Sequence, residues 1–293
     1  MDYFSNAHQP MILIADSGST KTDWLLMASN GEHHEFRTDG INPVRDTRDT
    51  IYNVIYHQLL TQLPPLKEIE KAQHNVYFYG AGCIEPFSQT IYSVICELLP
   101  GCIVEVESDL LGAARALCAN EPGIACILGT GCNSCLFDGK DIVMNTPPLG
   151  YILGDEGSGA MLGKTLLNGL FKGTLPKELK QEFCAKYDLT LPRIIERVYR
   201  LPAANTFLAS LVPFIAEHHT NPAIHDMLVG AFRLFIVRNI AIYGHPEMPI
   251  HCVGGVAHQF SEELSEAATA EGMHIGKILQ KPIEAILQYH LNN

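Results

Sequence analysis

The chain has 293 residues, of which 47% are hydrophobic and 18% are charged, so it is long enough for two ordinary globular domains, each with its own core. Lys and Arg number 20 against 32 Asp and Glu, which gives a formal net charge of −12. Such a charge repels nucleic acid and anionic membrane surfaces, so binding to either through bulk charge is excluded. The 24 glycines are close to the ordinary share, so any meaning they have depends on their positions.

The sequence predicts a soluble, cytoplasmic protein with no nucleic acid or membrane partner. No run approaches the roughly 20 apolar residues that cross a bilayer, and residues 1–10 lack the basic and then apolar pattern of a signal peptide. The nine cysteines are spread through apolar runs. This is typical of reduced thiols that serve as small core residues.

The first part of the chain predicts an α/β domain. An apolar run at residues 11–15 predicts a buried strand that ends in a polar turn, and the hairpin signal Asn30-Gly31 joins two further strands. Strands and helices then alternate, which favours an α/β fold. The predicted elements are strands at 11–15, 22–28, 32–37, 75–79 and 102–107, and helices at 46–63, 86–99 and from 108 onward.

The opening pattern recurs near residue 123. A strand at 124–128, a polar turn at 129–133, a strand at 134–137, the turn Asp138-Gly139 and a strand at 140–144 repeat the earlier order, which predicts two related halves. We expect an N-terminal lobe of residues 1–118, on which the C-terminal helix 282–293 packs, and a C-terminal lobe of residues 119–281. A helical insertion is expected over about 171–249.

Two turns occupy equivalent places in the two halves. The first is Asp16 to Thr22 and the second is Gly129 to Asn133. Glycine lets backbone N–H groups approach a phosphate, hydroxyls can donate to it, and a carboxylate such as Asp16 can reach Mg²⁺. Each turn alone is also compatible with an ordinary polar turn, but the pair predicts two loops that hold one polyphosphate.

Ser108-Asp109 lies where a predicted strand passes into a helix. Both residue types are good helix N-caps, which is the structural interpretation. The functional interpretation is a carboxylate at the carboxyl end of an α/β strand, where ligands bind, that acts as a general base toward a hydroxyl. The local sequence leaves both open.

Two glycine-rich segments in the second half also have two interpretations. Gly150 to Gly159 encloses Asp155 and Glu156; acids favour a helix start, but the glycines suggest the close approach of a ligand. Gly254-Gly255 follows a predicted strand and is suited either to packing or to a nucleotide. Two further patterns are rejected as sites, because Gly163-Lys164 lies inside a predicted helix and is no Walker loop, and Cys132 and Cys135 have no second pair at zinc spacing.

Taken together, these motifs resemble the acetate kinase/sugar kinase/Hsp70/actin superfamily, and within it the N-acetylglucosamine kinase-like branch of the BadF/BadG/BcrA/BcrD ATPase family. The matching segments, in the order of the family, are Asp16 to Thr22, Gly40-Ile41-Asn42-Pro43, Ser108-Asp109, Gly129 to Asn133, Gly150, Gly154-Asp155-Glu156-Gly157-Ser158 and Gly254-Gly255. The resemblance implies a two-lobed actin-like (ribonuclease H-like) α/β fold with duplicated βββαβαβα domains and ATP and Mg²⁺ in an interdomain cleft. It also implies transfer of the γ-phosphoryl group to the 6-hydroxyl of an amino sugar.

The resemblance further implies roles for single residues. Asp109 is similar to the general base on the sugar hydroxyl, and Asp16 to the Mg²⁺ carboxylate. The implied sugar contacts are Asn42, Asp109, Asn133, Gly150 and Asp155, and the implied nucleotide contacts are Gly18, Ser19, Thr20, Thr130, Gly131, Gly254 and Gly255. Cys132 departs from the serine expected in the second loop, so one hydroxyl contact is missing there.

Alternatives stay open at this point. N-acetylglucosamine is the expected acceptor, with N-acetylmuramic acid and glucosamine as rivals. A second class is an ATP-hydrolysing activator of a partner enzyme, of the 2-hydroxyacyl-CoA dehydratase activator type, and a third is a sugar sensor without catalysis. A homodimer is also left open.

Overall fold

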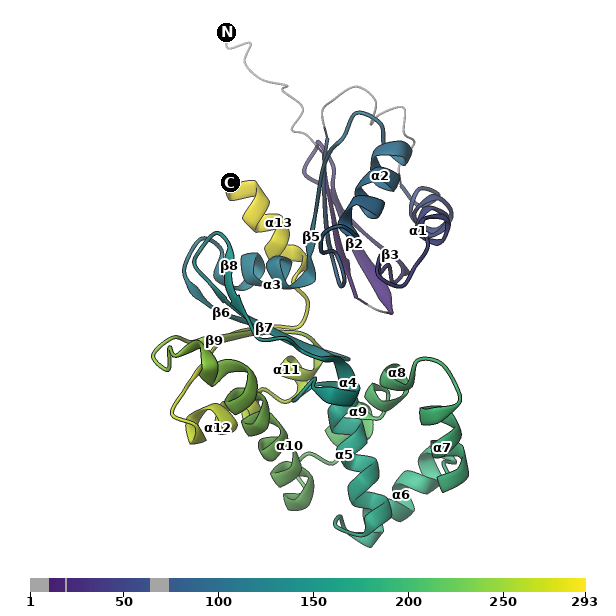
Figure 1. The fold of residues 1–293 in the computed structure, drawn as a ribbon, viewed down its shortest axis with the longest axis vertical. Coiled ribbons are helices and arrows are strands. Elements are labelled where there is room, and N and C mark those ends of the chain that lie inside the picture. Colours follow the sequence, from purple (N-terminus) through teal and green to yellow (C-terminus); the bar gives the residue numbers. More distant parts are fainter. Residues whose placement is uncertain (1–10, 19, 64–73) are drawn as a thin grey trace. The chain divides into compact units, whose positions relative to one another are not determined.

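The computed structural model describes residues 11–18, 20–63 and 74–293, and the chain divides into two compact units. One unit ends at Ala116 and takes in Pro282–Asn293, and the other is Leu117–Lys281. Each unit is built on a five-stranded mixed sheet with helices (Figure 1). Among the described residues, no helix is both long and apolar enough to cross a membrane.

The sheet of the first unit has the strand order β3-β2-β1-β4-β5. Strands β1, β2 and β3 are antiparallel neighbours, whereas β4 runs parallel to β1 and β5 runs parallel to β4. The elements are β1 (Ile12–Ser17), β2 (Lys21–Met27), β3 (His33–Asp39), α1 (Arg48–Val54), the π-helix η1 (Ile55–Leu59), β4 (Asn75–Gly80), α2 (Ser88–Leu98), β5 (Ile103–Ser108), α3 (Asp109–Cys118) and α13 (Ile283–Asn292).

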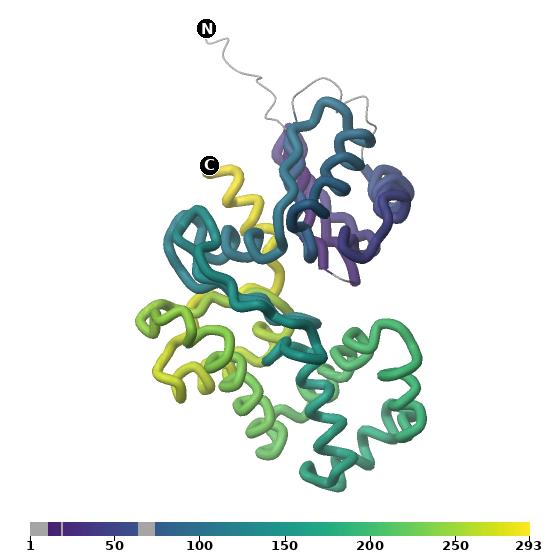
Figure 2. Tube along the Cα trace, in the orientation of Figure 1, coloured from purple at the N-terminus to yellow at the C-terminus, as the bar shows by residue number. Residues whose placement is uncertain are grey.

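The two faces of this sheet are covered by different helices. Leu13 and Phe78 belong to the core that includes residues of α1 and α2. On the other face, the hydroxyl of Tyr79 is 2.8 Å from Nε2 of His290 in α13 and accepts a 2.5 Å hydrogen bond from Arg115 in α3. The ring of Tyr289 also lies under the guanidinium of Arg115, so α3 and α13 are neighbours (Figure 2). The end of the chain is therefore anchored on the first sheet.

The sheet of the second unit has the order β10-β9-β6-β7-β8, which repeats that of the first. Strands β6, β7 and β8 are antiparallel neighbours, whereas β9 runs parallel to β6 and β10 runs parallel to β9. The elements are β6 (Gly123–Leu128), β7 (Cys132–Phe137), β8 (Ile142–Asn145), α4 (Gly150–Leu153), α5 (Gly159–Lys172), α6 (Lys177–Tyr187), α7 (Leu191–Tyr199), α8 (Ala204–Ala209), α9 (Val212–Glu217), α10 (Pro222–Phe235), the π-helix η3 (Ile236–Ile240), the 3₁₀-helix η4 (Ala241–Tyr243), β9 (Ile250–Val253), α11 (Gly255–Gln259), α12 (Ser261–Ala270) and β10 (Ile275–Leu279).

The repeated topology confirms the α/β fold with two related halves that the sequence predicted. Between β8 and β9 the chain is helical, and this region buries an aromatic cluster that includes Phe183, Phe214 and Phe232. Gly163 and Lys164 lie inside α5, as the sequence indicated, so they form no Walker loop.

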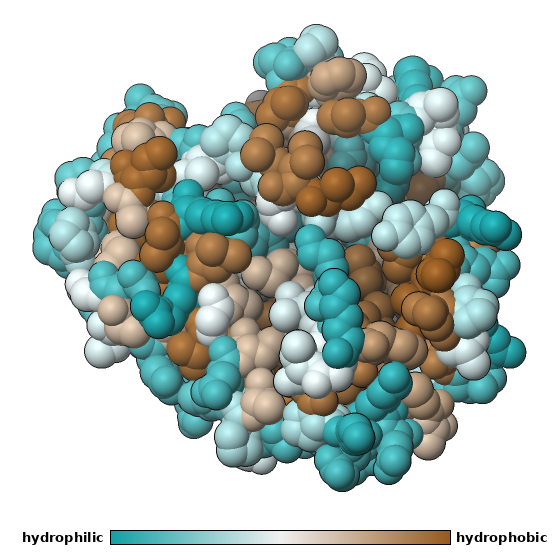
Figure 3. Space-filling model, turned by 60° about the horizontal axis from the view of Figure 1, so that its bottom comes forward, coloured by the Kyte–Doolittle hydropathy of each residue, from teal (hydrophilic) through white to brown (hydrophobic). Residues whose placement is uncertain are grey.

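Exposed apolar side chains occur in both units. Ile84 and Tyr92 are exposed in the first unit, and Ile152 and Leu153 in the second. The face drawn in Figure 3 carries apolar areas in several places between polar ones. Single exposed apolar side chains are ordinary for a folded surface, whereas Leu149, Ile152 and Leu153 are grouped at α4.

Candidate active site

The predicted site residues of the first unit gather at the carboxyl ends of its parallel strands. In the sheet, Ser17 at the end of β1 is paired with Gly80 at the end of β4, and Gly80 with Ser108 at the end of β5. The three strands therefore end at one level, which is the edge of an α/β sheet at which ligands bind.

The turn between β1 and β2 is a tight hairpin in which two hydroxyls are used internally. Ser17 and Thr22 are fully buried, and their hydroxyl oxygens are 2.7 Å apart. Ser17 Oγ also bonds the backbone of Ile41, and Thr22 donates to the carbonyl of Asp39. These two side chains hold the loop and cannot also serve a phosphate. Gly18 and Thr20 of the same turn are exposed. Ser19 lies outside the described residues.

Asn42, a predicted sugar contact, is held against the turn that follows β4. Its Oδ1 accepts a 3.0 Å hydrogen bond from the backbone of Val44. The same oxygen would be 2.5 Å from a Cβ added to Gly82, whose φ is +80°, so only glycine fits at that position. The backbone N–H of Asn42 donates to Asp46 Oδ2 at 2.8 Å, whereas its side-chain nitrogen Nδ2 bonds no described residue.

Asp109 is the first residue of α3, but Ser108 is its cap. Ser108 Oγ accepts a 3.2 Å hydrogen bond from the backbone N–H of Leu111, which is the usual N-cap arrangement. Asp109 Oδ1 accepts one from Leu110 at 2.9 Å, and its second oxygen has no partner in the described part of the chain. Burial raises the pKa of Asp109 to about 6. A carboxylate with one free oxygen and such a pKa suits a general base.

Asp16 is the carboxylate of this edge that the sequence predicts for a divalent cation. It lies one residue before the end of β1, half-buried, in the same row of the sheet as Tyr79 and Glu107. No group of three or more His, Cys, Asp or Glu side chains that could hold a metal is found among the described residues. Mg²⁺ in phosphoryl-transfer sites is commonly held by one or two carboxylates together with substrate phosphates, so a single carboxylate fits such a shared site.

In the second unit, the predicted phosphate loop is docked on the start of α5. The carbonyls of Gly129 and Thr130 accept hydrogen bonds from the backbone N–H groups of Gly159 and Ala160, at 2.8 and 3.1 Å. Within the loop, the N–H of Gly129 donates to the carbonyl of Gly131 at 3.0 Å. A Cβ added to Gly129 would meet nothing within 4 Å, so a ligand can approach the backbone there.

Asp155, two residues after the end of α4, contacts this loop. It is buried, with φ +56°, and its Oδ1 accepts a long 3.4 Å hydrogen bond from the N–H of Cys132. Its Oδ2 would be 3.2 Å from a Cβ on Gly131. Burial raises the pKa of Asp155 above its usual value. The structure thus brings Asp155, Gly131 and Asn133 of β7 into one neighbourhood, while Gly150 lies exposed at the start of α4.

The glycines around Asp155 allow segments of the chain to pack closely, whereas the sequence suggested that they allow a ligand to approach. A Cβ on Gly154 would be 2.0 Å from the carbonyl oxygen of Pro148, and one on Gly159 would be 3.2 Å from that of Gly129. These glycines permit close packing of the chain itself. The same holds for Gly254, with φ +125° and a Cβ position 2.3 Å from the carbonyl oxygen of Leu128, whereas Gly255 is exposed and open.

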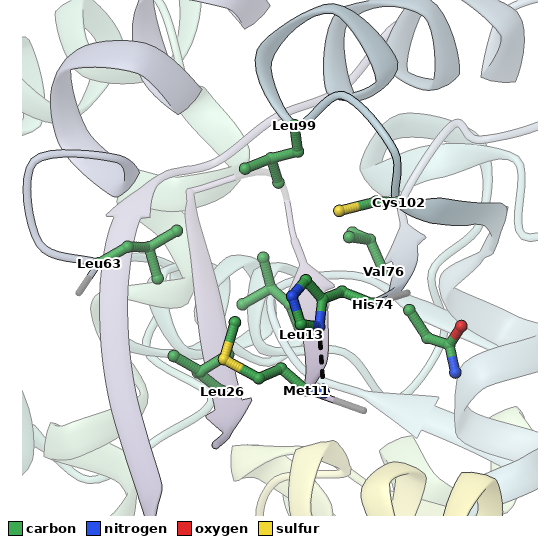
Figure 4. Close-up of a pocket in the computed structure, with 9 residues that line it drawn as sticks. Met11, Leu13, Leu26, Leu63, His74, Val76, Leu99 and Cys102 are labelled. Atoms are coloured by element: carbon green, nitrogen blue, oxygen red, sulfur yellow. Dashed lines mark hydrogen bonds between the residues drawn. The ribbon is translucent and has the colours of Figure 1, made fainter. Parts of the chain in front are cut away.

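A small pocket in the first unit lies away from this edge (Figure 4). Met11 and His74 come just before β1 and β4, and the N–H of Met11 donates to His74 Nδ1 at 3.2 Å. The pocket is therefore at the amino ends of strands whose carboxyl ends carry the site. Its lining is almost wholly apolar, and it offers no group for phosphoryl transfer. The lining residues are Met11, Leu13, Leu26, Leu63, His74, Asn75, Val76, Leu99 and Cys102.

The structure of the putative N-acetylglucosamine kinase of Porphyromonas gingivalis is similar to this chain throughout. The two sequences are 46% identical, the match covers 96% of this chain and 99% of that one, and the TM-score is 0.92. The chain belongs to the N-acetylglucosamine kinase-like branch of the BadF/BadG/BcrA/BcrD ATPase family.

More distant structures share the fold of this kinase-like family. The putative N-acetylglucosamine kinase of Chromobacterium violaceum is 16% identical, with a TM-score of 0.64 over 96% of this chain and 98% of that one. The hexokinase of Schistosoma mansoni is 10% identical, with a TM-score of 0.53 over 98% and 86%. No model of a protein family matches the sequence, and no curated protein sequence matches it. These similarities confirm the actin-like fold.

In this family member, the structure adds two residues that the sequence did not suggest, Arg238 and Asn239, and both bond Glu156. Glu156, next to Asp155, accepts hydrogen bonds from Arg238 at 2.9 Å and from the amide nitrogen of Asn239 at 3.3 Å. Burial alone would raise the pKa of Glu156, but these hydrogen bonds and the charge of Arg238 lower it. The two partners are 82 and 83 residues away in the chain, in a region without a recognisable motif, so no sequence signal pointed to them.

Proposed function

We propose that the chain transfers the γ-phosphoryl group of ATP to the 6-hydroxyl of an amino sugar, and that this sugar is N-acetylglucosamine. Membership of the family makes the chain an ATP-dependent sugar kinase in class. Asp109 is the single observation that carries the proposal to a reaction on a hydroxyl. Its free carboxylate oxygen and its pKa of about 6 leave it ionised at neutral pH and able to take a proton.

Catalysis of phosphoryl transfer is mostly positioning and charge stabilisation. Asp109 accepts the hydroxyl proton as the oxygen attacks phosphorus. We propose Asn42, Asn133, Gly150 and Asp155 as contacts of the sugar.

The phosphates are bound by backbone N–H groups of the two loops. In the first loop the N–H of Gly18 donates to the carbonyl of Lys21 at 3.0 Å, so we propose that Gly18 gives the ligand room and that Thr20 donates an N–H. Ser19 stays a predicted contact, and Thr130 and Gly131 contribute from the second loop. Mg²⁺, when bound, neutralises charge on the phosphate oxygens, and Asp16 is the carboxylate that we propose for it. Gly255 offers an open backbone to the nucleoside.

The cysteines argue against an activator that shares an iron–sulfur cluster between subunits. Cys132 and Cys135 are buried, and burial raises the pKa of both thiols, that of Cys135 to about 12. Cluster ligands must reach the partner subunit, and these two thiols are buried inside their own unit.

A coupled assay of ADP release tests the proposal. ATP and Mg²⁺ are supplied with N-acetylglucosamine, N-acetylmuramic acid, glucosamine or no sugar, and Asp109→Asn is run beside the parent. We expect release that depends on N-acetylglucosamine and falls about 10²–10⁴-fold in the variant. Release that no sugar stimulates, or a variant as fast as the parent, would show that the proposal is wrong.

A further inference from the structure

Asn239 lies at the centre of a buried hydrogen-bond network in the second unit. Its side chain is 4% exposed, and its amide nitrogen donates to Glu156 Oε2 at 3.3 Å and to the carbonyl of Phe235 at 3.2 Å. Arg238 donates to the other oxygen of Glu156 at 2.9 Å. Consecutive residues thus hold both oxygens of one carboxylate, so the Glu156 side chain has a single defined position.

The backbone of Asn239 reaches a second element. Its carbonyl oxygen accepts hydrogen bonds from the hydroxyls of Thr146, at 2.9 Å, and of Ser134, at 3.3 Å. The hydroxyl of Tyr243 reinforces this contact, because it lies 2.7 Å from Ser134 Oγ and accepts a 3.1 Å hydrogen bond from the N–H of Thr146. Thr146 and Ser134 are thereby tied to the same helical turn.

Both arms of this network end beside a proposed sugar contact. Glu156 follows Asp155, whose φ of +56° is costly for a residue with a side chain and needs support from its surroundings. Ser134 follows Asn133, and the amide nitrogen of Asn145, next to Thr146, donates to Asn133 Oδ1 at 2.9 Å. Together with the N–H of Ser134, which donates to the same oxygen at 3.0 Å, this bond fixes the orientation of the Asn133 side-chain amide.

The local helix geometry explains why Asn239 can bond Glu156 through its side chain and both Thr146 and Ser134 through its backbone. Residues Ile236–Ile240 form a π-helix, in which the N–H of Ala241 bonds the carbonyl of Ile236. Such a turn widens the helix and is often found at functional sites. The helical segment ends at Tyr243, and carbonyls near a helix end need partners outside the helix; for Asn239 these partners are the two hydroxyls.

We infer that Asn239, with Arg238, is a positioning residue that holds Asn133 and Asp155 in place for the acceptor sugar. The inference rests on the proposed function only in its assignment of these two residues to the sugar. It predicts that disturbing the turn weakens sugar binding more than it slows the chemical step or weakens ATP binding.

The kinetic test uses two variants and a matched control. Asn239→Asp keeps the size of the side chain but removes the donor and places a second carboxylate beside Glu156. Arg238→Gln removes the charge at a side chain that is 60% exposed, so it remains folded even if the first variant does not. Arg233→Gln on α10 is the control, because it breaks the 2.7 Å ion pair with Glu271 outside the network. We expect KM for the sugar to rise about tenfold in both variants, with kcat and KM for ATP within about threefold and the control unchanged.

Hydrogen exchange tests the same network without relying on activity. In both variants, but not in the control, we expect faster amide exchange in residues 132–135 and 154–158. Unchanged exchange in these two segments overturns the inference, and so does faster exchange with an unchanged KM for the sugar. If the parent protein phosphorylates no amino sugar, the proposed function fails, and exchange alone then decides whether Asn239 holds the two segments.

Discussion

The hydroxyl of Ser108 caps helix α3, while the carboxylate of the adjacent Asp109 keeps one oxygen free. Ser108 Oγ accepts from the N–H of Leu111 at 3.2 Å, and Asp109 uses only Oδ1, toward Leu110 at 2.9 Å. The two interpretations of this dipeptide, cap and base, therefore belong to different residues. Mutation should separate them.

Ser108→Ala and Asp109→Asn should affect different quantities. Loss of the cap should lower the free energy of unfolding by about 0.5–2 kcal/mol and leave kcat within a few fold. Asp109→Asn should lower kcat about 10²–10⁴-fold and leave the fold intact. Urea unfolding and initial rates measured on both variants check this. A Ser108→Ala variant as inactive as Asp109→Asn would contradict the division of roles.

The pH dependence of the rate should report Asp109. Because burial raises its pKa to about 6 and only the ionised form accepts a proton, kcat/KM should fall about tenfold per unit below pH 6. A rate profile from pH 5 to 8 at saturating Mg²⁺ measures this. An acid limb near pH 4, the usual range of an exposed Asp, would mean that Asp109 is not the base.

The same pKa shift links Asp109 to stability. Its pKa in the folded chain lies above the unfolded value of about 3.9, so the folded state binds this proton more tightly. Its contribution to stability is complete below about pH 4 and is lost as the pH rises through 6. Asp109→Asn should therefore raise Tm at pH 8 by a few degrees and leave it unchanged near pH 4. Thermal unfolding at the two pH values checks the sign.

Two glycines of the second unit should respond oppositely to alanine. Gly129→Ala adds a Cβ to open space, whereas Gly254→Ala adds one 2.3 Å from the carbonyl oxygen of Leu128 at φ +125°. We expect Gly129→Ala to fold like the parent with KM for ATP raised about tenfold, and Gly254→Ala to lose more than about 2 kcal/mol of stability. Unfolding curves and ATP titrations distinguish them. An unchanged KM for ATP in Gly129→Ala would remove this glycine from the phosphate site.

Tyr79→Phe should loosen the C-terminal helix. The hydroxyl of Tyr79 bonds Arg115 and His290, and its loss leaves these half-buried polar groups with fewer partners. A cost of about 1–3 kcal/mol is expected. The rate of amide hydrogen exchange should rise first in α13. Tyr289→Phe is a control, since its ring stacks on Arg115 and phenylalanine keeps that ring.

The sequence predicts those parts of the fold that have local signals. Asn30-Gly31 marks the β2–β3 hairpin, where Gly31 has φ +84°, and the two glycine- and threonine-containing turns mark the ends of β1 and β6. The helix predicted over 46–63 is interrupted at Ile55, where a π-helix begins, and no residue pattern announced the change.

The site was predictable only to the extent that its residues lie in recognisable turns. Asp109 and Asp155 could be named because glycine, serine or a strand end stands beside them. Arg238 and Asn239 could not, because their contacts with Glu156 depend on a π-helical turn and on helix packing more than 80 residues away. For the glycines of 154–159 the sequence favoured a ligand but left a helix start open, and the structure shows Gly154 and Gly159 packed against carbonyl oxygens of the chain itself.

The most direct test of the proposed reaction is nuclear magnetic resonance of its product. The protein is incubated with ATP, Mg²⁺ and N-acetylglucosamine labelled with ¹³C at carbon 6, and phosphorus coupling to that carbon is recorded. We predict a new phosphomonoester signal coupled to carbon 6, which Asp109→Asn does not produce in the same time. A phosphomonoester signal without coupling to carbon 6, or inorganic phosphate as the sole product, would contradict the proposal.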